Sequence, residues 1–221
     1  MSFTRFAIYY LPPEGALAQF GAAWLGWDVG TGTGTVQPAV DGIEEVTRTP
    51  RKYGFHATLK PPFRLAEGTT QAGLEQAAAT LAASLPAARA ESIGLSRLGR
   101  FLALTLEGAT RGVEQIAARC VTDLDRFRAP AGEAELARRR ASGLSAAQDA
   151  LLLQWGYPYV LDEFRFHMTL TGRLDDPAPW EATLAKALPP LPAPFRLDQI
   201  ALVGEREDGR FELIHRYALS G

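Results

Sequence analysis

Residues 54–60 read Gly-Phe-His-Ala-Thr-Leu-Lys, and residues 165–171 read Arg-Phe-His-Met-Thr-Leu-Thr. Both stretches contain the pattern Phe-His-x-Thr-Leu, centred on His56 in the first copy and on His167 in the second. The chain has 3 histidines in 221 residues, and two of them lie in this one pattern. The copies are separated by half the chain length, which predicts two related lobes that each carry one copy.

The residue types in both copies are typical of β-strands, in which successive side chains point to opposite faces. We expect one face of each strand to be apolar and to pack in a core. The other face would carry the polar side chains, which are His56, Thr58 and Lys60 in the first copy and Arg165, His167, Thr169 and Thr171 in the second. Each strand would then present an imidazole beside a hydroxyl, with a cation nearby.

Paired strands of this kind in a chain of this length resemble the 2H phosphoesterase superfamily, which is named for two His-x-[Ser/Thr]-x motifs. The wider context is Arg-Lys-Tyr-Gly-Phe-His-Ala-Thr-Leu-Lys-Pro-Pro-Phe at 51–63 and Trp-Gly-Tyr-Pro-Tyr-Val-Leu-Asp-Glu-Phe-Arg-Phe-His-Met-Thr-Leu-Thr-Gly-Arg at 155–173. It resembles the DUF1045 branch of uncharacterised proteins, which is associated with phosphonate-utilisation operons. The resemblance implies an α+β fold with two pseudo-twofold lobes, in which two antiparallel sheets flanked by helices surround a central groove. It also implies phosphoesterase activity that requires no metal.

The hydrophobic pattern predicts the same α+β class. In the first half we expect a strand at 5–11, a helix at 16–27, the first motif strand stopped by Pro61-Pro62, a helix at 71–85, a hairpin at 92–106 and a helix at 111–127. The second half would repeat the theme with its motif strand, a helix at 180–188 and a hairpin at 196–219. Two short helices in a helical insertion at about 129–156 interrupt the pattern, with Ser145 as a helix N-cap. Nothing reads as a linker, so we expect a single bilobal domain over residues 1–221.

The composition is that of a soluble globular protein, with 47% hydrophobic and 22% charged residues. A net charge of −2 argues against a surface that holds long nucleic acid. The single cysteine, Cys120, lies in a helical pattern and is expected to be a packed thiol. No apolar run approaches the length that spans a bilayer, and the N-terminus lacks the pattern of a signal peptide. These features predict a cytoplasmic protein that does not bind membranes.

Two imidazoles suit a pair of proton-transfer groups, since the unperturbed pKa of histidine lies near neutral pH. One would activate the attacking oxygen and the other would protonate the leaving oxygen during in-line attack on phosphorus. The hydroxyls of Thr58 and Thr169 would hold the non-bridging oxygens. The sequence leaves open whether His56 or His167 is the base. We expect no cofactor.

Four further residues are candidates for binding the substrate phosphate. Lys60 and Arg165 follow the strand period of the two histidines, and Arg173 continues it beyond the second copy. Tyr53 is one step out of that period, so it is expected to pack at the edge of the strand or to stack on the substrate. The residues themselves indicate only a small phosphoester. The resemblance to the superfamily implies a cyclic or 2′-linked phosphoester, expected here as a small cyclic phosphodiester, and the phosphonate association points to a phosphorylated sugar such as a ribose cyclic phosphate.

Other interpretations of the same residues remain. A metal site built from His56, His167, His215 and carboxylates would lack the close His-x-His or His-x-x-x-His pairing that often begins such sites. A non-catalytic binding or sensor protein for a small phosphorylated ligand would use the same groove. The Gly-rich run 30–34 lacks the features of a phosphate-binding loop and is expected to be flexible. The oligomeric state and the role of His215 are left open.

Overall fold

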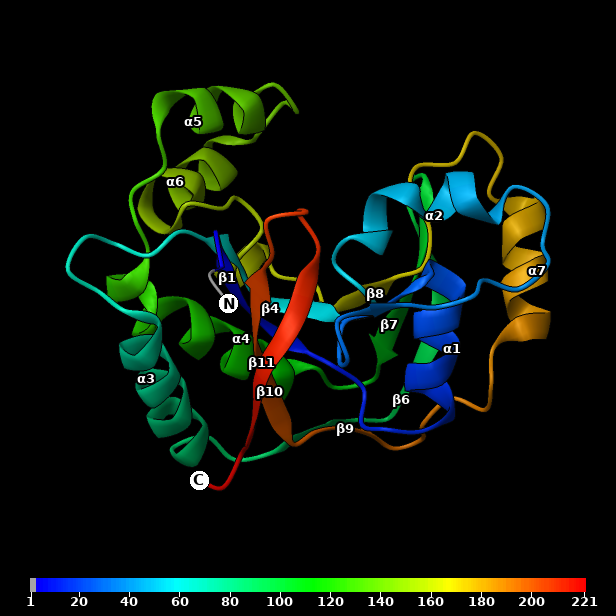
Figure 1. The fold of residues 1–221 in the computed structure, drawn as a ribbon, viewed down its shortest axis with the longest axis horizontal. Helices are drawn as coiled ribbons and strands as arrows, with labels where there is room; N and C mark the ends of the chain where they lie inside the picture. The colour runs from blue at the N-terminus through cyan, green and yellow to red at the C-terminus, as the bar shows by residue number, and fades with distance from the viewer. Residues whose placement is uncertain (1–2) are drawn as a thin grey trace.

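One antiparallel sheet of seven strands runs through the molecule, in the order β11-β10-β1-β4-β8-β7-β6 (Figure 1). The structure is a computed structural model that describes residues 3–221. The strands are β1 (Phe6–Tyr10), β2 (Trp27–Asp28), β3 (Thr33–Gly34), β4 (Ala57–Phe63), β5 (Ala88–Ala90), β6 (Ser92–Leu98), β7 (Phe101–Glu107), β8 (His167–Thr169), β9 (Phe195–Leu197), β10 (Gln199–Glu205) and β11 (Phe211–Ala218). The pairs β2–β3 and β5–β9 form two small additional sheets.

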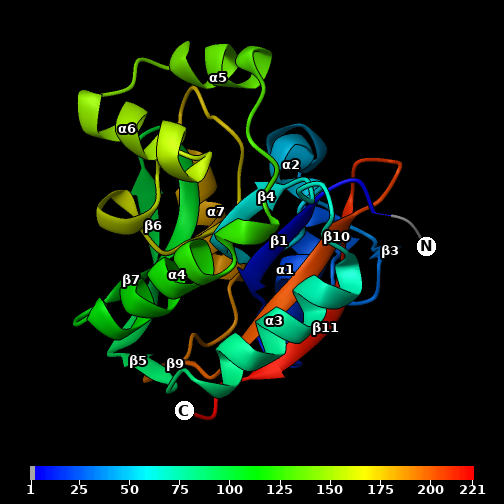
Figure 2. The same ribbon diagram turned by 90° about the vertical axis from the view of Figure 1, so that its left-hand side faces the viewer.

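Helices cover the sheet and connect its strands. They are α1 (Ala16–Leu25), α2 (Ile43–Arg51), α3 (Gln71–Ala83), α4 (Arg111–Asp123), α5 (Glu133–Arg140), α6 (Ala146–Trp155) and α7 (Ala178–Ala187), with short 3-10 turns η1 (Asp125–Phe127) and η2 (Leu161–Glu163). Figure 2 shows α3 and α4 lying on the same side of the sheet, where α4 packs on β4 and α3 packs on β10 and β11. The predicted α+β class is confirmed.

The two expected sheets are the two halves of one sheet, which meet where β4 pairs with β8. The hairpin β6–β7 from the first half of the chain pairs with the second motif strand. The hairpin β10–β11 from the second half reaches the first motif strand through β1. Each half of the sheet therefore contains strands from both halves of the chain. Periodicity identifies strands but contains no information on which strands pair.

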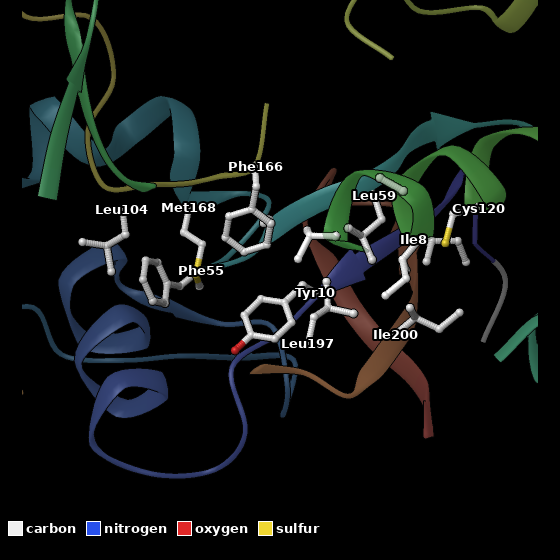
Figure 3. Packing of buried hydrophobic residues seen from close by; sticks show 14 of the residues in the cluster. Ile8, Tyr10, Phe55, Leu59, Leu104, Cys120, Phe166, Met168, Leu197 and Ile200 are labelled. Carbon is white, nitrogen blue, oxygen red and sulfur yellow. The ribbon is translucent and has the colours of Figure 1, made fainter. Parts of the chain in front are cut away.

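The predicted alternation of side chains along the motif strands is confirmed at residues 55–59 and 166–170. We call the side of the sheet that carries His56 and His167 the histidine face, and the opposite side the core face. All six apolar neighbours in the two copies are buried on the core face: Phe55, Ala57, Leu59, Phe166, Met168 and Leu170. Figure 3 shows Met168 packing beside Phe55 and Leu104 in this core. The Phe55 ring also packs on α1, where a Cβ on Gly21 would come within 1.9 Å of it.

Strand β4 continues to Phe63, beyond the predicted stop at Pro61-Pro62. Its pairing with β1 changes register twice, once on each side of the Ile8↔Lys60 pair. The two prolines lie in the second irregularity, between Lys60 and Phe63. Prolines are tolerated in a strand at such bulges, because the local ladder does not require their missing N–H groups.

The helical insertion has the two predicted helices, α5 and α6. Ser145 caps α6 and accepts a hydrogen bond from the backbone N–H of Gln148, whose side chain in turn accepts from the N–H of Ser145, as in a capping box. Figure 1 shows α5 and α6 together at one side of the molecule, away from α1, α2 and α7. Within the described residues, no helix combines the length and apolar character needed to cross a bilayer.

Candidate active site

The pairing of β4 with β8 brings the two motifs together on the histidine face. Ala57 is opposite Met168 in this antiparallel pair, so His56 lies opposite Thr169 and Thr58 lies opposite His167. Opposite side chains on one face of such a pair have Cβ atoms about 5 Å apart, and diagonal ones about 7–8 Å. The two imidazoles and two hydroxyls therefore form one four-residue group, with the histidines on its diagonal.

The ring of His56 is fixed on both of its nitrogens. Its Nδ1 lies 2.9 Å from the carbonyl oxygen of Gly54, and its Nε2 lies 3.0 Å from the Thr58 hydroxyl. Because a carbonyl only accepts hydrogen bonds, Nδ1 carries the proton in the neutral ring and the Thr58 hydroxyl donates to Nε2. Gly54 has φ +71°, and a Cβ there would come within 2.5 Å of the Val29 Cβ, so the carbonyl position depends on glycine.

The ring of His167 is held in the same way. Its Nδ1 donates to the carbonyl oxygen of Arg165, two residues earlier, at 2.7 Å. In both motifs, the backbone carbonyl two residues before the histidine thus orients the imidazole. Because Nδ1 carries the proton in each neutral ring, Nε2 is the basic nitrogen. Such an arrangement can accept a proton at one Nε2 and release a proton from the other.

His56 has the more enclosed environment of the two. Its ring stacks on Tyr9 with centroids 3.7 Å apart and an interplanar angle of 24°. Burial lowers the pKa of His56 to about 4, the Gly54 carbonyl opposes this change, and the nearby His167 adds to it. His56 is therefore neutral at neutral pH, which suits a group that accepts a proton.

A pocket of about 300 Å³ opens beside the four-residue group. It is lined by Thr49, Pro50, Tyr53, His56, Phe101, Thr169, Thr171, Gly172 and Arg173. The structure thus brings Tyr53 and Arg173, two of the residues singled out in the sequence, to the same pocket as His56 and Thr169. The exposed Arg173 is a cation at the pocket, and Tyr53 contributes an aromatic wall.

Lys60 does not reach the histidine face, and the prediction that it lies at the site is wrong. The bulge beside it pairs Lys60 with Ile8, whose side chain is in the core, so Lys60 turns to the core face. Its side chain is 2% exposed, and its Nζ donates to the carbonyl of Val121 at 2.9 Å and contacts Asp125 at 3.3 Å. Pattern alone could not locate a bulge of one residue.

The side chain of Arg165 is exposed and lines a neighbouring pocket that contains Ser96, Arg97 and Thr105. It is absent from the lining of the pocket beside His56. Chain segment 164–166 precedes β8 and has no ladder partner, so the strand period that predicted its direction does not apply there. The main chain of Arg165 is at the site through the hydrogen bond to His167.

Two residues at the site were not found from the sequence: Tyr9 stacks on His56, and Phe101 lies with its ring centroid 5.9 Å from that of His167. Thr171, which the strand period placed on the polar face, is buried, and its hydroxyl accepts a hydrogen bond from the N–H of Leu102. Tyr9 and Phe101 belong to strands that resemble ordinary core strands. Only the pairing of β1 with β4 and of β7 with β8 brings them beside the histidines.

The alternative sites find no support in the geometry. His215 is exposed on β11 and contacts Tyr217, apart from the two motifs. Among residues 3–221, no group of three or more His, Cys, Asp or Glu side chains is arranged to hold a metal ion. Cys120 is buried, as predicted, and burial raises the pKa of its thiol to about 12, which leaves it protonated.

Comparison with known proteins gives two curated relatives and a set of solved structures. The chain is 43% identical over 179 residues to ribose 1,5-bisphosphate phosphokinase PhnN of Janthinobacterium sp. (strain Marseille), a match that covers 78% of this chain. It is 34% identical over 175 residues to the protein of the same name from Laribacter hongkongensis (strain HLHK9), which again covers 78% of the chain. The matched part spans only 40% and 41% of those relatives.

The solved structures include E. coli LigT in apo form, with a TM-score of 0.48 and 16% identity, and a phosphoesterase with a TM-score of 0.46 and 15% identity. Both comparisons cover the whole of both chains. A family model described as a protein of unknown function (DUF1045) matches residues 58–212, which is more than half of the chain. The chain therefore belongs to the DUF1045 family.

Proposed function

We propose that this protein is a phosphoesterase that hydrolyses a small cyclic phosphodiester by acid–base catalysis with His56 and His167. The observation that carries the proposal is the pairing of the two motif strands, which sets two imidazoles on one face with Thr58 and Thr169. Each ring is oriented by a backbone carbonyl at Nδ1 and directs its catalytic chemistry through Nε2. A pocket of about 300 Å³ beside them has room for a small phosphorylated molecule.

In this mechanism His56 is the base and His167 is the acid. The Nε2 of His56 takes a proton from water as the water oxygen forms a bond to phosphorus. The bond from phosphorus to the leaving oxygen breaks, and the protonated Nε2 of His167 gives its proton to that oxygen. The products are a phosphomonoester and a free hydroxyl, and transfer of one proton from His56 to His167 through solvent restores the starting state.

Two features support this assignment of roles. Burial lowers the pKa of His56 to about 4, so this imidazole has no proton at neutral pH, as a base requires. The hydroxyl of Thr58 occupies the Nε2 of His56 in the free protein and lies opposite His167 on the neighbouring strand. It would turn to a phosphoryl oxygen when the attacking water takes its place, with Thr169 as the equivalent donor of the second motif.

The pocket and the names of the relatives support the proposed substrate class. The curated relatives are named for ribose 1,5-bisphosphate, and the matched segment makes up about two-fifths of each of them. We propose that this segment handles a chemically related molecule, a ribose cyclic phosphate. One guanidinium, that of Arg173, in a pocket of about 300 Å³ suits a small anion better than a polynucleotide.

The test is hydrolysis of a panel of ribose cyclic phosphates and nucleoside 2′,3′-cyclic phosphates, with and without EDTA. We expect turnover that is unchanged by EDTA, and a loss of roughly 10²–10⁴-fold in kcat for His56→Ala and for His167→Ala. The double variant should lose less than the product of the two single effects, because the two residues act as a unit. His215→Ala is the matched control, since this exposed histidine lies outside the site.

Two outcomes would contradict the proposal. Activity that disappears with EDTA and returns with zinc or manganese would indicate metal-dependent chemistry. Binding of these ligands without any turnover by the unmodified protein would favour a non-catalytic binding or sensor protein. In that case the His56→Ala change would alter only the dissociation constant.

A further inference from the structure

The two histidines of the site differ in their aromatic neighbours. The ring of His56 lies face to face with Tyr9, with centroids 3.7 Å apart and an interplanar angle of 24°. The ring of His167 has Phe101 as its aromatic neighbour, at 5.9 Å and an angle of 58°. The stack thus covers a whole face of one imidazole, while the other has only a tilted contact. This asymmetry is independent of the motif, which is the same around both histidines.

Tyr9 is held rigidly in this position. It lies on β1 between Thr58 of β4 and Ala201 of β10, and its side chain is 0% exposed. A second hydrophobic cluster on the histidine face packs around it and includes Trp27 and Phe211. Its ring is therefore enclosed by packed side chains, and it excludes water from the face of the imidazole that it covers.

The Tyr9 hydroxyl is not used by the fold. Within residues 3–221 it is buried and has no hydrogen-bond partner. A buried hydroxyl without a partner destabilises the folded state, so the hydroxyl does not account for a tyrosine at this position. Of the aromatic contacts of the Tyr9 ring, the stack on His56 is closer and more nearly parallel than the tilted contact with Phe211, whose centroid lies 5.9 Å away at 39°.

We propose that Tyr9 is a positioning residue, which stacks on His56 and keeps this imidazole unprotonated so that it enters the reaction as the base. The inference rests on the proposed function, since it assigns the cause of a difference between the two catalytic histidines. Phe101 makes only a tilted contact with His167, the histidine that acts as the acid in the proposed reaction.

Two opposing effects of the stack must be weighed. An aromatic face attracts a cation, which favours the protonated imidazole. Loss of water around the ring disfavours it, because a charged imidazole depends on solvation. The pKa of His56 is lowered to about 4 with burial as the largest cause, so the loss of water dominates. Several ionisable groups face the stacked pair. His167, Tyr53 and Arg173 lie on the side of His56. Arg5, Glu205 and Tyr157 lie on the side of Tyr9.

The experiment follows the titration of each histidine by NMR in the whole protein, with His56→Gln and His167→Gln spectra used for assignment. The unmodified protein should show a His56 midpoint well below 6.5. In Tyr9→Leu, which removes the ring, we expect this midpoint to rise by at least about one pH unit toward the ordinary value of histidine. In Tyr9→Phe, which keeps the ring and removes only the hydroxyl, we expect no change.

The matched control is Phe101→Leu, which should leave the His56 midpoint in place. Activity gives a second readout through the pH profile of kcat/KM. If the His56 midpoint returns to 6.5, the fraction of neutral His56 at pH 5 falls from about nine-tenths to about a thirtieth. Tyr9→Leu should then lose kcat/KM at pH 5 by up to about 30-fold relative to pH 8, beyond the change in the unmodified protein.

Three results would overturn the inference. The first is a His56 midpoint near 6.5 in the unmodified protein, which can be measured even if Tyr9→Leu does not fold. The second is an unchanged or lower midpoint in Tyr9→Leu, which would mean that attraction between the imidazolium and the ring dominates. The third is an equal rise in Tyr9→Phe, which would assign the effect to the hydroxyl. Failure of the proposed activity would leave the NMR titrations measurable, so the two hypotheses can fail separately.

Discussion

Replacement of Lys60 by methionine tests the most direct correction that the structure makes to the sequence. Lys60 is buried on the core face and contacts Val121 and Asp125. Burial is the largest cause that lowers its pKa, from 10.5 to about 8, and the attraction of Asp125 only partly opposes this. The unfolded chain therefore holds the Lys60 proton up to a higher pH than the folded protein does.

The sign and size of the effect follow from this difference. Between pH 8 and pH 10.5 the unfolded state binds the proton that the folded state has lost, so the free energy of unfolding rises with pH in this window. The rise is about 1.4 kcal/mol per pH unit and about 3 kcal/mol in all. The Lys60→Met variant lacks this contribution. At neutral pH it loses a costly buried charge but leaves the Val121 carbonyl without a partner, which costs about 1–3 kcal/mol, so the two changes nearly offset each other.

The assay is urea unfolding of both proteins between pH 7 and pH 10. We expect the unmodified protein to gain stability relative to Lys60→Met as the pH rises. Taking the difference between the two proteins cancels the contributions of all other titratable groups. Turnover at pH 7 should be little changed, because Lys60 lies on the opposite face from the histidines. Parallel stability curves would refute the reasoning about the buried amine. A loss of kcat/KM as large as that of His56→Ala would refute its placement outside the site.

Three further predictions concern the site itself. Thr58→Val should raise KM, and it should lower kcat by less than either histidine replacement, because it removes one donor and leaves both proton-transfer groups. Steady-state kinetics would check this, and a loss of kcat equal to that of His56→Ala would contradict it. Gly54→Ala should destabilise the fold by about 1–3 kcal/mol in urea unfolding, because φ at this residue is +71° and the new Cβ would collide with Val29. An unchanged free energy of unfolding would mean that the loop can rearrange. The folded-state pKa of His56 lies below its unfolded value, so its contribution to stability is present above pH 6.5 and lost as the pH falls to 4. The loss relative to His56→Gln should be at most about 3 kcal/mol, and an absence of any difference between the two proteins would show that burial does not act on this ring.

The sequence predicts the strands and the residues on them better than it predicts their neighbours. The Phe-His-x-Thr-Leu period correctly assigns His56, Thr58, His167 and Thr169 to one face, because the alternation of a strand is a local property. The face to which the Lys60 side chain points depends on a bulge in the pairing of β4 with β1. Such a bulge depends on both strands and cannot be seen in the sequence of one of them. Local pattern therefore fails at the residue where pairing becomes irregular.

The same distinction explains the aromatic residues of the site. Tyr9 is 47 residues from His56 in the chain, and nothing in the sequence Phe-Ala-Ile-Tyr-Tyr separates it from its buried neighbour Tyr10. The two tyrosines point to opposite faces, and only Tyr9 lies across from Thr58. The role of Tyr53 was ambiguous for a related reason, because it precedes β4 and reaches the pocket through the turn at Gly54.

The exchange of hairpins between the two halves of the sheet has a consequence for how the chain folds. Strand β1 is synthesised before the other strands of the sheet, and its partner β10 begins only at Gln199. Because contacts between such distant segments close large loops, folding of the sheet is expected to be slow and to wait until β10 has been synthesised. Until then β1 has an exposed apolar edge, so the nascent chain would be prone to aggregation and would benefit from a chaperone.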